Sequence, residues 1–347
     1  MRKKSTVRLM IGFSLVLFLL GCLTFGLASA AKFPFRNGDK IILTVPFAPG
    51  GGFDTYTRLL APPLEKAIEK MGGINVSCIV KNLPGAGGRV AHEKVFRSKP
   101  NGRTILLAHG GALPYHQVIY KARLETSQFT YLGQISEFRN SIVVRTDLPI
   151  NSFWDLVKRS QKQPILMASA GVGDDPHISP LLIKAFLKEE GIEWNMDFVQ
   201  FEGTAPARAS LPRKETEAIY TVIGSLYPIV ASGDGKFIIV FAKERDYRCP
   251  DVPTIFEEKV PRANQIMEAV SSAWTMVGPP KMPDETTRVL REAIKTVVNG
   301  KEFLGRAEKA KRTVFYRSGP ESQQITSGKV QVIKRYENMI KAAMGLK

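Results

Sequence analysis

The chain has 347 residues, of which 44% are hydrophobic and 23% are charged. These values are ordinary for a folded protein and exclude a long disordered chain, and the length predicts two lobes of roughly 100–150 residues each. The formal net charge of +17 is compatible with nucleic acid, an anionic surface or an anionic small ligand. Because the basic residues are scattered, with no stripe interleaved with aromatics, a nucleic-acid partner is not expected.

Residues 1–30 predict a secretory signal peptide. A basic start precedes an uncharged apolar run, and Ala28–Ala30 places small residues before a cut at Ala31. Two alternatives stay open, lipidation of Cys22 within LLGC and retention of the run as a membrane anchor. Each version puts the folded part in the periplasm or on the outer face of the cytoplasmic membrane. The segment holds four basic residues and no acid, so its removal lowers the charge from +17 to +13.

The first half of the folded part alternates strands with helices. Strand patterns at 40–47, 75–82 and 103–111 are separated by helical patterns at 55–70 and 89–99. This order predicts parallel strands joined by crossover helices. Pro62 and Pro63 are expected to kink or interrupt the first helix.

The same alternation resumes further along the chain. A helix near 151–161, capped by Asn151 or Ser152, precedes a strand and glycine loop at 163–175 and a helix that Gly191 stops. Later strand patterns occupy 196–204, 218–224, 236–244 and 272–280, and helices occupy 283–310 and 321–344. Two α/β lobes without a flexible linker predict a cleft between them, with the ligand beyond the carboxyl ends of the strands.

The loops at those strand ends do not carry the residues of common catalytic sites. GGGFDT lacks the lysine of a phosphate-binding loop, and GAGGRVA lacks the acid that a dinucleotide site places about 20 residues further on. The four histidines form no metal-binding pair and no CxxC occurs, so no metal or cofactor is expected. There is no G-x-S-x-G either, although Ser169 and Ser225 keep a secreted hydrolase open as an alternative.

The remaining interpretation is that the protein binds a small ligand without catalysing a reaction. Gly51–Phe53 and Gly171–Gly173 each precede a helix, where backbone N–H groups and the helix dipole favour a carboxylate. Two such loops facing each other would hold both ends of a dicarboxylate. The competing interpretation is that these glycines only permit tight turns. Whether Cys78 and Cys249 pair cannot be decided from their spacing.

Six ordered motifs then identify a family. VPFAPGGGFDTYTRLLA, VKNLPGAGGRVA, PNGRTILLA, ASAGVGDDPH, RCPDVPTIFE and AWTMVGPPKMP cover nearly all of the chain after residue 30. Together they resemble the substrate-binding proteins of tripartite tricarboxylate transporters, the Bug family. The resemblance implies a two-lobed periplasmic-binding-protein fold of type II, in which each lobe is a mixed sheet flanked by helices and the lobes close on a small carboxylate. It also implies no enzymatic activity, a membrane permease as partner, and a monomer.

The resemblance also implies which residues bind the ligand and where the lobes divide. Lobe 1 is expected at 31–135 plus 250–347 and lobe 2 at 136–249. His177 is expected either to tie its helix to the neighbouring strand or to contact the ligand. The residues expected to bind ligand are Phe47, Ala48, Gly51, Gly52, Asp54, Gly110, Gly111, Ser169, Gly171, Gly173, Asp174, Gly203, Thr204, Gly224 and Ser225.

Two acids depart from the family pattern, which commonly has a small residue at position 174 and a basic one at position 202. Asp174 and Glu202 would repel a carboxylate unless they point away or the ligand carries a donor or cation. Arg89 and His109 are expected to supply positive charge on the first lobe. We therefore expect a ligand with one carboxylate and one donating or cationic end, such as an amino acid or a nicotinate-like aromatic carboxylate. A sensor that signals to a receptor kinase stays open as an alternative to a transport receptor.

Overall fold

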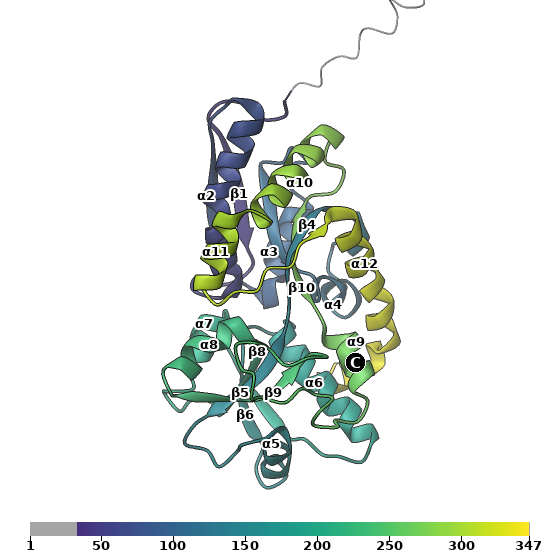
Figure 1. The fold of residues 1–347 in the computed structure, drawn as a ribbon. Coiled ribbons are helices and arrows are strands. Elements are labelled where there is room, and N and C mark those ends of the chain that lie inside the picture. The colour runs from purple at the N-terminus through teal and green to yellow at the C-terminus, as the bar shows by residue number, and fades with distance from the viewer. Residues whose placement is uncertain (1–32, 347) are drawn as a thin grey trace, which may run out of the picture. The chain divides into compact units, whose positions relative to one another are not determined.

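Two separate β-sheets organise the chain, one in each lobe (Figure 1). The computed structural model describes residues 33–346, and residues from Pro34 onward form one compact unit that contains both sheets. The predicted signal peptide and Cys22 lie outside the described residues.

The first sheet has six strands and is mixed. β1 pairs in parallel with β2 and β3, whereas β10 runs antiparallel between β3 and β4. In spatial order the strands are β11 (Arg317–Ser318), β4 (Thr130–Glu137), β10 (Ala273–Gly278), β3 (Thr104–His109), β1 (Asp39–Val45) and β2 (Val76–Asn82). The sequence pattern misses β4, because buried polar residues such as Gln134 and Ser136 interrupt its apolar run.

The second sheet has five strands and is also mixed. β6 is parallel to β7 and β8, and β5 is antiparallel to β8 and β9. In spatial order the strands are β7 (Met196–Gln200), β6 (Ile165–Ser169), β8 (Ala218–Val222), β5 (Asn140–Arg145) and β9 (Gly235–Phe241). Two mixed sheets flanked by helices confirm the predicted fold class, although β5 is not predicted from the sequence pattern.

Helices flank both sheets. They are α2 (Gly52–Gly72), α3 (Arg89–Phe96), α4 (Ala112–Val118), α5 (Phe153–Ser160), α6 (Asp175–Glu189), α7 (Thr204–Ala209), α8 (Ile223–Ala231), α9 (Ala263–Val270), α10 (Asp284–Val298), α11 (Lys301–Lys309), α12 (Gly319–Arg335) and α13 (Glu337–Ala343), with 3₁₀ turns at Ala86–Gly88 and Thr126–Gln128.

Local signals explain some helix boundaries and fail at others. Ser152 caps α5 through a reciprocal capping box with Asp155, as predicted. The expected interruption at Pro62 and Pro63 is wrong, because α2 runs through both residues. Pro63 and its neighbours Leu60 and Leu64 are buried, and this packing outweighs the backbone hydrogen bonds that the prolines cannot make.

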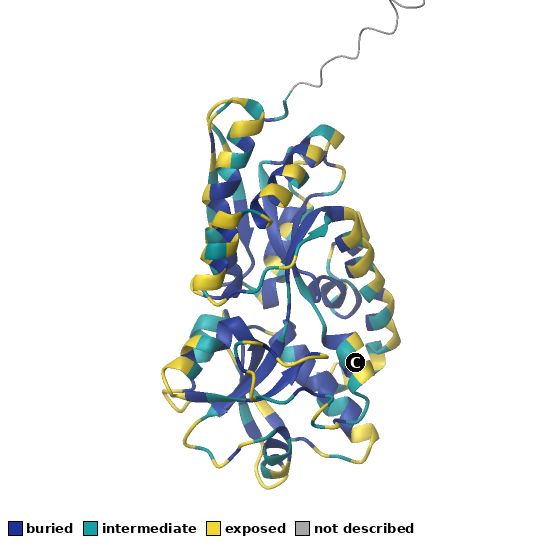
Figure 2. Cartoon of the chain, viewed as in Figure 1, coloured by how far each residue is buried: buried dark blue, intermediate teal, exposed yellow. Residues whose placement is uncertain are grey.

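The lobes are joined at Phe138 and Arg139, between β4 and β5, and by residues 242–272, which return from β9 to β10. Most strands of both sheets are buried, apart from the edge strands β2 and β7, and the outer helix faces are exposed (Figure 2). The core around the second sheet also contains Ile255, Ile266 and Ile340. Residues 255–270 and α13 therefore share a core with the second sheet and with α4 and α12, and the lobe boundary at residue 250 stays a prediction.

Both described cysteines are free thiols. Cys78 lies on β2 and Cys249 lies beyond β9. Burial raises the pKa of Cys78 to about 12 and that of Cys249 to about 11. Both thiols are therefore protonated near neutral pH and are poor nucleophiles.

Candidate functional site

A small cavity lies between the lobes, at the carboxyl ends of β1, β3, β6 and β8. Its volume is about 10 Å³, close to the space that one water requires. This interlobe cleft is therefore closed in the structure. It is lined by Phe47, Gly52, Phe53, His109, Phe138, Asp174, Asp175, Pro176, Thr204, Thr221, Val222, Ser225 and Trp274.

Three helices begin at this cavity. α2 begins at Gly52, α6 at Asp175 and α8 at Ile223, and each first turn contributes lining residues. The N-cap side chains of these helices make no capping hydrogen bonds. The positive ends of three helix dipoles consequently converge from both lobes, an arrangement that favours an anion.

Aromatic rings fill most of the remaining space. The ring centroid of Phe53 lies 4.7 Å from that of Phe47 and 5.6 Å from those of His109 and Trp274. Phe138 approaches both His109 and Trp274, with centroids 4.7 Å apart in each case. A ligand larger than water therefore requires these rings to move or the lobes to separate.

Asp174 and His109 face each other across the cleft. His109 Nε2 lies 3.7 Å from Asp174 Oδ1, and both side chains are almost fully buried. The Ala112 N–H donates to His109 Nδ1 at 3.0 Å, so the imidazole proton is on Nε2 and points towards Asp174. Burial lowers the pKa of His109 well below its usual value. His109 is therefore neutral, and the prediction that it supplies positive charge is wrong.

The carboxyl group of Asp174 is unusual for a helix start. Asp174 occupies the N-cap position of α6, yet its side chain makes no capping bond, and Oδ1 has no hydrogen-bond partner among the described residues. Burial, reinforced by the charge of Asp175, raises the pKa of Asp174 well above its usual value. The cleft thus contains a buried acid that is free to bond a ligand.

Asp175 is held by the second lobe instead. Ser179 Oγ donates to Asp175 Oδ1 at 2.6 Å and Asn140 Nδ2 donates to Oδ2 at 3.0 Å. Burial raises the pKa of Asp175 to about 6, although these hydrogen bonds and Lys329 act in the opposite direction.

Asp54 positions the loop after β1. Its carboxylate accepts hydrogen bonds from the Gly50 N–H at 2.9 Å, from Arg58 Nε at 3.0 Å and from Asn82 Nδ2 at 3.1 Å. Burial raises its pKa, but these bonds outweigh burial and lower it. Asp54 does not line the cavity, so its carboxylate orients the loop and does not face the ligand space.

Glycines bring the two lobes into contact. A methyl group at Gly87 would lie 2.6 Å from Val172 O and 2.8 Å from Asp174 N, and one at Gly171 would lie 3.0 Å from Gly87 Cα. Next to this contact, the Ala48 N–H donates to Glu202 O at 3.1 Å, from one lobe to the other. Because glycine has no side chain, these residues allow the lobes to close and also allow the turns to form.

Arg312 forms a second interlobe contact, which the sequence analysis missed. Its Nη1 donates to Ser225 Oγ at 3.0 Å, and burial lowers its pKa to about 10. Arg208 Nη1 donates to Ser225 O at 2.6 Å. Within residues 33–346, neither arginine has a carboxylate within 4.0 Å. No local motif marks Arg312, since only the tertiary fold brings it to the start of α8.

The structure brings together five of the fifteen predicted ligand residues, namely Phe47, Gly52, Asp174, Thr204 and Ser225, as lining of the cleft. Gly171 lines an adjacent cavity of about 230 Å³, together with Phe47 and the loop at Gly85–Gly88. Ala48, Gly51 and Gly203 lie at the closure contact, where Gly51 faces Thr204 and Gly203 faces Ala48.

Of the other predicted residues, Gly110, Gly111 and Ser169 make hydrogen bonds of the scaffold, whereas Gly173 and Gly224 lie at further interlobe contacts. The Gly110 N–H donates to Ala273 O and the Gly111 N–H to Ser272 Oγ, so both amides are occupied. Ser169 Oγ bonds the Gly171 turn. A methyl group at Gly173 would collide with Tyr120, and one at Gly224 with Lys311 O.

Two further side chains lie away from the cavity. His177 accepts from the Gly173 N–H at 3.2 Å and packs on Phe198 of β7, the structural arrangement expected of it. Arg89 stacks on Tyr120 at 5.1 Å and is not among the lining residues. Arg89 thus contributes no direct contact to the cleft.

A protein-family model matches most of the chain. The model described as "Tripartite tricarboxylate transporter family receptor" matches residues 64–345. Among curated relatives, a UPF0065 protein of Bordetella pertussis is 28% identical over 283 residues, covering 80% of this chain and 81% of that protein.

Solved structures share the fold. The periplasmic binding protein BugD superposes with a TM-score of 0.74 at 24% identity, covering 88% of this chain and 98% of BugD. MatC from Rhodopseudomonas palustris, with bound malate, gives a TM-score of 0.71 at 23% identity, covering 87% of this chain and 99% of MatC. Within residues 33–346, no helix has the length and apolar character required to cross a bilayer.

Proposed function

The chain belongs to the tripartite tricarboxylate transporter receptor family, and from that premise we propose that it captures a small carboxylate between its lobes and delivers it to a membrane permease. As a member of this family it is a periplasmic binding receptor and not an enzyme. The observation that carries the proposal is the convergence of the N-termini of α2, α6 and α8 on one interlobe cavity. Backbone amides at helix starts bind carboxylates without a cationic side chain.

The two ends of the cavity differ in what they offer a ligand. At one end, Trp274 Nε1 is a buried donor without a partner in the described chain, and a methyl group at Gly52 would lie within about 3 Å of both Ser225 and Trp274. At the other end, Asp174 Oδ1 is a buried acceptor without a partner. Buried polar groups are seldom left unpaired in a working complex, so the ligand has a carboxylate at the Ser225 end and a donor at the Asp174 end.

An amino acid meets both requirements. Its carboxylate accepts from the helix N-termini and Trp274, and its ammonium group donates to Asp174 and lies against the aromatic rings. Malate, the ligand in the MatC structure, offers a hydroxyl donor but carries a second carboxylate that the ionised form of Asp174 would repel. We therefore propose that this receptor prefers amino acids or similar zwitterions to dicarboxylates.

Lobe closure is the signal in this proposal. A volume of about 10 Å³ cannot admit such a ligand, so entry requires an open form and binding shifts the population to a closed form. The permease would recognise the closed form. Delivery to a permease requires that the protein is exported, and the predicted signal peptide implies this export.

A ligand screen tests the proposal. The protein without residues 1–30 is heated with malate, succinate, citrate, aspartate, glutamate or nicotinate, and a ligand that binds only the folded form raises the midpoint of unfolding. The best ligand is then titrated calorimetrically into the wild type and Asp174→Ser. We expect the variant to bind dicarboxylates more tightly and amino acids more weakly. An unchanged preference would contradict the role of Asp174, and failure of every carboxylate would contradict the receptor function.

A further inference from the structure

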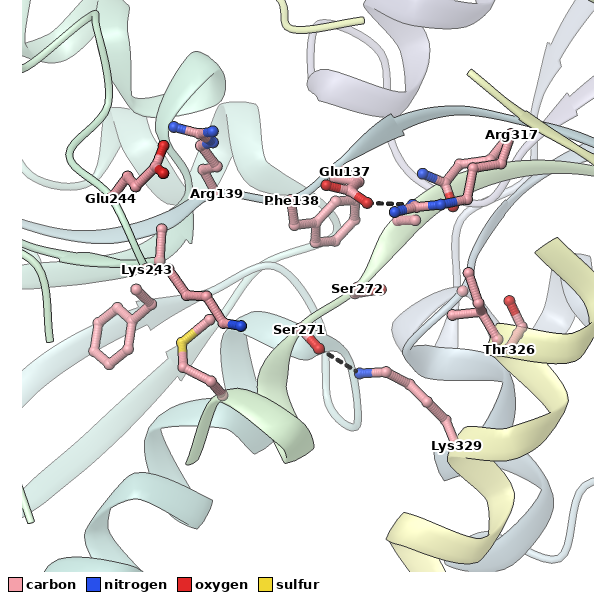
Figure 3. Close-up of a pocket in the computed structure, with 17 residues that line it drawn as sticks. Glu137, Phe138, Arg139, Lys243, Glu244, Ser271, Ser272, Arg317, Thr326 and Lys329 are labelled. Atoms are coloured by element: carbon pink, nitrogen blue, oxygen red, sulfur yellow. Dashed lines mark hydrogen bonds and ion pairs between the residues drawn. The ribbon is translucent and has the colours of Figure 1, made fainter. Parts of the chain in front are cut away.

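A second cavity lies behind the interlobe cleft, at the hinge (Figure 3). Its volume is about 360 Å³, within the range of small-molecule sites. Phe138 is the one residue that lines both this hinge cavity and the interlobe cleft. The hinge cavity is thus a separate space on the other side of that ring.

Two amines face the hinge cavity without a carboxylate partner. Figure 3 shows the amines of Lys243 and Lys329 pointing towards Ser271, in the middle of the cavity. Lys329 Nζ donates to Ser271 Oγ at 3.2 Å, which leaves two of its three donor positions. In the part of the chain that the structure describes, neither lysine has an acid within 4.0 Å.

The two arginines that line the hinge cavity are engaged with acids. Arg317 is paired with Glu137, and Arg139 lies 4.0 Å from Asp246. Glu244 lies on the Arg139 side of the cavity, away from the Lys329 amine (Figure 3). The lining thus has four cationic and two acidic side chains, and the excess positive charge comes from the two lysines.

A buried amide also lies beside the hinge cavity. Gln134 lines the hinge cavity and is 1% exposed, and its Nε2 has no hydrogen-bond partner among the described residues. Burial also lowers the pKa of Lys329 to about 8, although Asp175 and Glu268 act in the opposite direction. An anion here would compensate the ammonium of Lys329, which is half-buried and costly when left without a counter-charge.

The remaining walls are apolar. Phe138, Phe241, Met267 and Ile325 contribute hydrophobic surface. From this combination we propose that the hinge cavity binds a small organic monocarboxylate, with the carboxylate on Lys243 and Lys329 and the hydrocarbon part on Phe138 and its apolar neighbours. This site is distinct from the interlobe cleft.

Both chain segments that connect the lobes line the hinge cavity, Glu137–Arg139 on one side and Ser271–Ala273 on the other. Because closure of the lobes turns these segments, the open and closed forms differ in the shape of the site. A ligand whose affinity differs between the two forms shifts the equilibrium between them.

The experiment uses 4-bromobenzoate, whose bromine can be located by anomalous scattering. Crystals of the protein without residues 1–30 are grown with the probe, and the probe is titrated into the wild type, Lys329→Met, Lys243→Ala and Lys334→Met. Lys334 lies exposed on the same helix as Lys329 and does not line the cavity. We expect a bromine peak in the hinge cavity, affinity about 10-fold weaker in Lys329→Met and Lys243→Ala, and wild-type affinity in Lys334→Met.

A bromine peak confined to the interlobe cleft would overturn the proposal. Wild-type affinity in both cavity variants would overturn it as well. Because Lys243 is exposed, its variant keeps the test valid if Lys329→Met fails to fold. The cleft of the wild type is titrated in parallel with aspartate and malate, so a wild type that binds a carboxylate in the cleft but no probe in the hinge cavity contradicts this proposal alone.

Discussion

The interlobe cleft and the hinge cavity both favour anions, but they do so by different means. The cleft has about 10 Å³ of free volume and is walled by helix N-termini, glycines and aromatic rings, whereas the hinge cavity has about 360 Å³ and is walled by charged side chains. The donors of the hinge cavity are the amines of Lys243 and Lys329, which lie at the ends of flexible side chains. The donors of the cleft are backbone amides that come from both lobes.

This difference shows what closure contributes. Amides of α2 belong to the first lobe and those of α6 and α8 to the second, so the complete anion site of the cleft exists only when the lobes meet. The lysines of the hinge cavity need no such assembly to carry charge. We therefore expect changes at the closure contact to affect the cleft strongly and the hinge cavity weakly.

The largest effect is expected from Gly87→Ala. Its methyl group would meet Val172 O at 2.6 Å and Asp174 N at 2.8 Å, which prevents full closure. Gly73→Ala is a matched control, because the two residues have φ of +61° and +62° and the space around Gly73 is open. Both variants lose about 1 kcal/mol to the left-handed backbone, measured by denaturant unfolding.

Only Gly87→Ala should lose ligand binding in the cleft, by about 100-fold or more. Small-angle X-ray scattering should show that it stays expanded with ligand present. Equal ligand affinity in the two variants would mean that this contact does not control closure.

The next largest effect is expected at the Arg312–Ser225 contact. Arg312→Met removes an interlobe hydrogen bond from a charged donor, and Ser225→Ala removes the acceptor. Each change should weaken ligand binding in the cleft by roughly 10-fold, and a double-mutant cycle should give a coupling energy of about 1–3 kcal/mol. Additive effects of the two changes would show that the hydrogen bond does not contribute to closure.

A smaller effect, on stability, is expected from Asp174→Asn. The folded-state pKa of Asp175 is about 6 against the usual 3.8, and that of Asp174 is also raised. Because these pKa values are higher in the folded state, the unfolded state loses its protons first as the pH rises. The contribution of the two acids to folding stability is therefore fully present below about pH 4 and is lost as the pH rises through the folded-state pKa near 6. Removing one acid should therefore raise the free energy of unfolding by roughly 1–3 kcal/mol at about pH 7.5.

The same change should have little effect at about pH 4, where the native carboxyls are protonated. Urea unfolding at both pH values measures the difference, with the exposed Asp251→Asn as the control. Equal stabilisation at both pH values would contradict the assignment of raised pKa values to this pair.

The smallest effect is expected from Arg89→Met. Its guanidinium stacks on Tyr120 and lies outside the lining of the cleft. We expect unchanged ligand affinity and a loss of stability of at most about 1 kcal/mol, from the cation–π contact. A marked loss of carboxylate affinity would instead restore the role predicted from the sequence, that of a charge supplied to the cleft.

Much of the architecture follows from local patterns, and the exceptions have identifiable causes. Alternating strand and helix signals predict β1, β2, β3 and β10 and the α/β class. β4 is missed because residues such as Gln134 and Ser136 are polar and yet buried, a combination that periodicity cannot reveal. The break expected at Pro62 fails because packing of the rest of α2 decides its continuity.

The candidate site shows the same limit. Glycines before helix starts are visible in a sequence, and they correctly direct attention to the loops that meet between the lobes. Whether a given amide is available depends on its partner, as with Gly110 and Gly111, whose N–H groups bond Ala273 and Ser272. Such partners are more than a hundred residues away in the chain, so no local signal shows them.

By itself, the sequence determined the family, the two α/β lobes and the loops that line their meeting point, because these depend on local propensity, periodicity and ordered motifs. Only the tertiary structure decided which of those loops contact each other, that His109 is neutral, that Arg312 reaches Ser225, and that Asp174 lies buried with an unpaired oxygen. Each of these properties arises from desolvation or from contacts between distant segments, and neither is encoded at a single position of the chain.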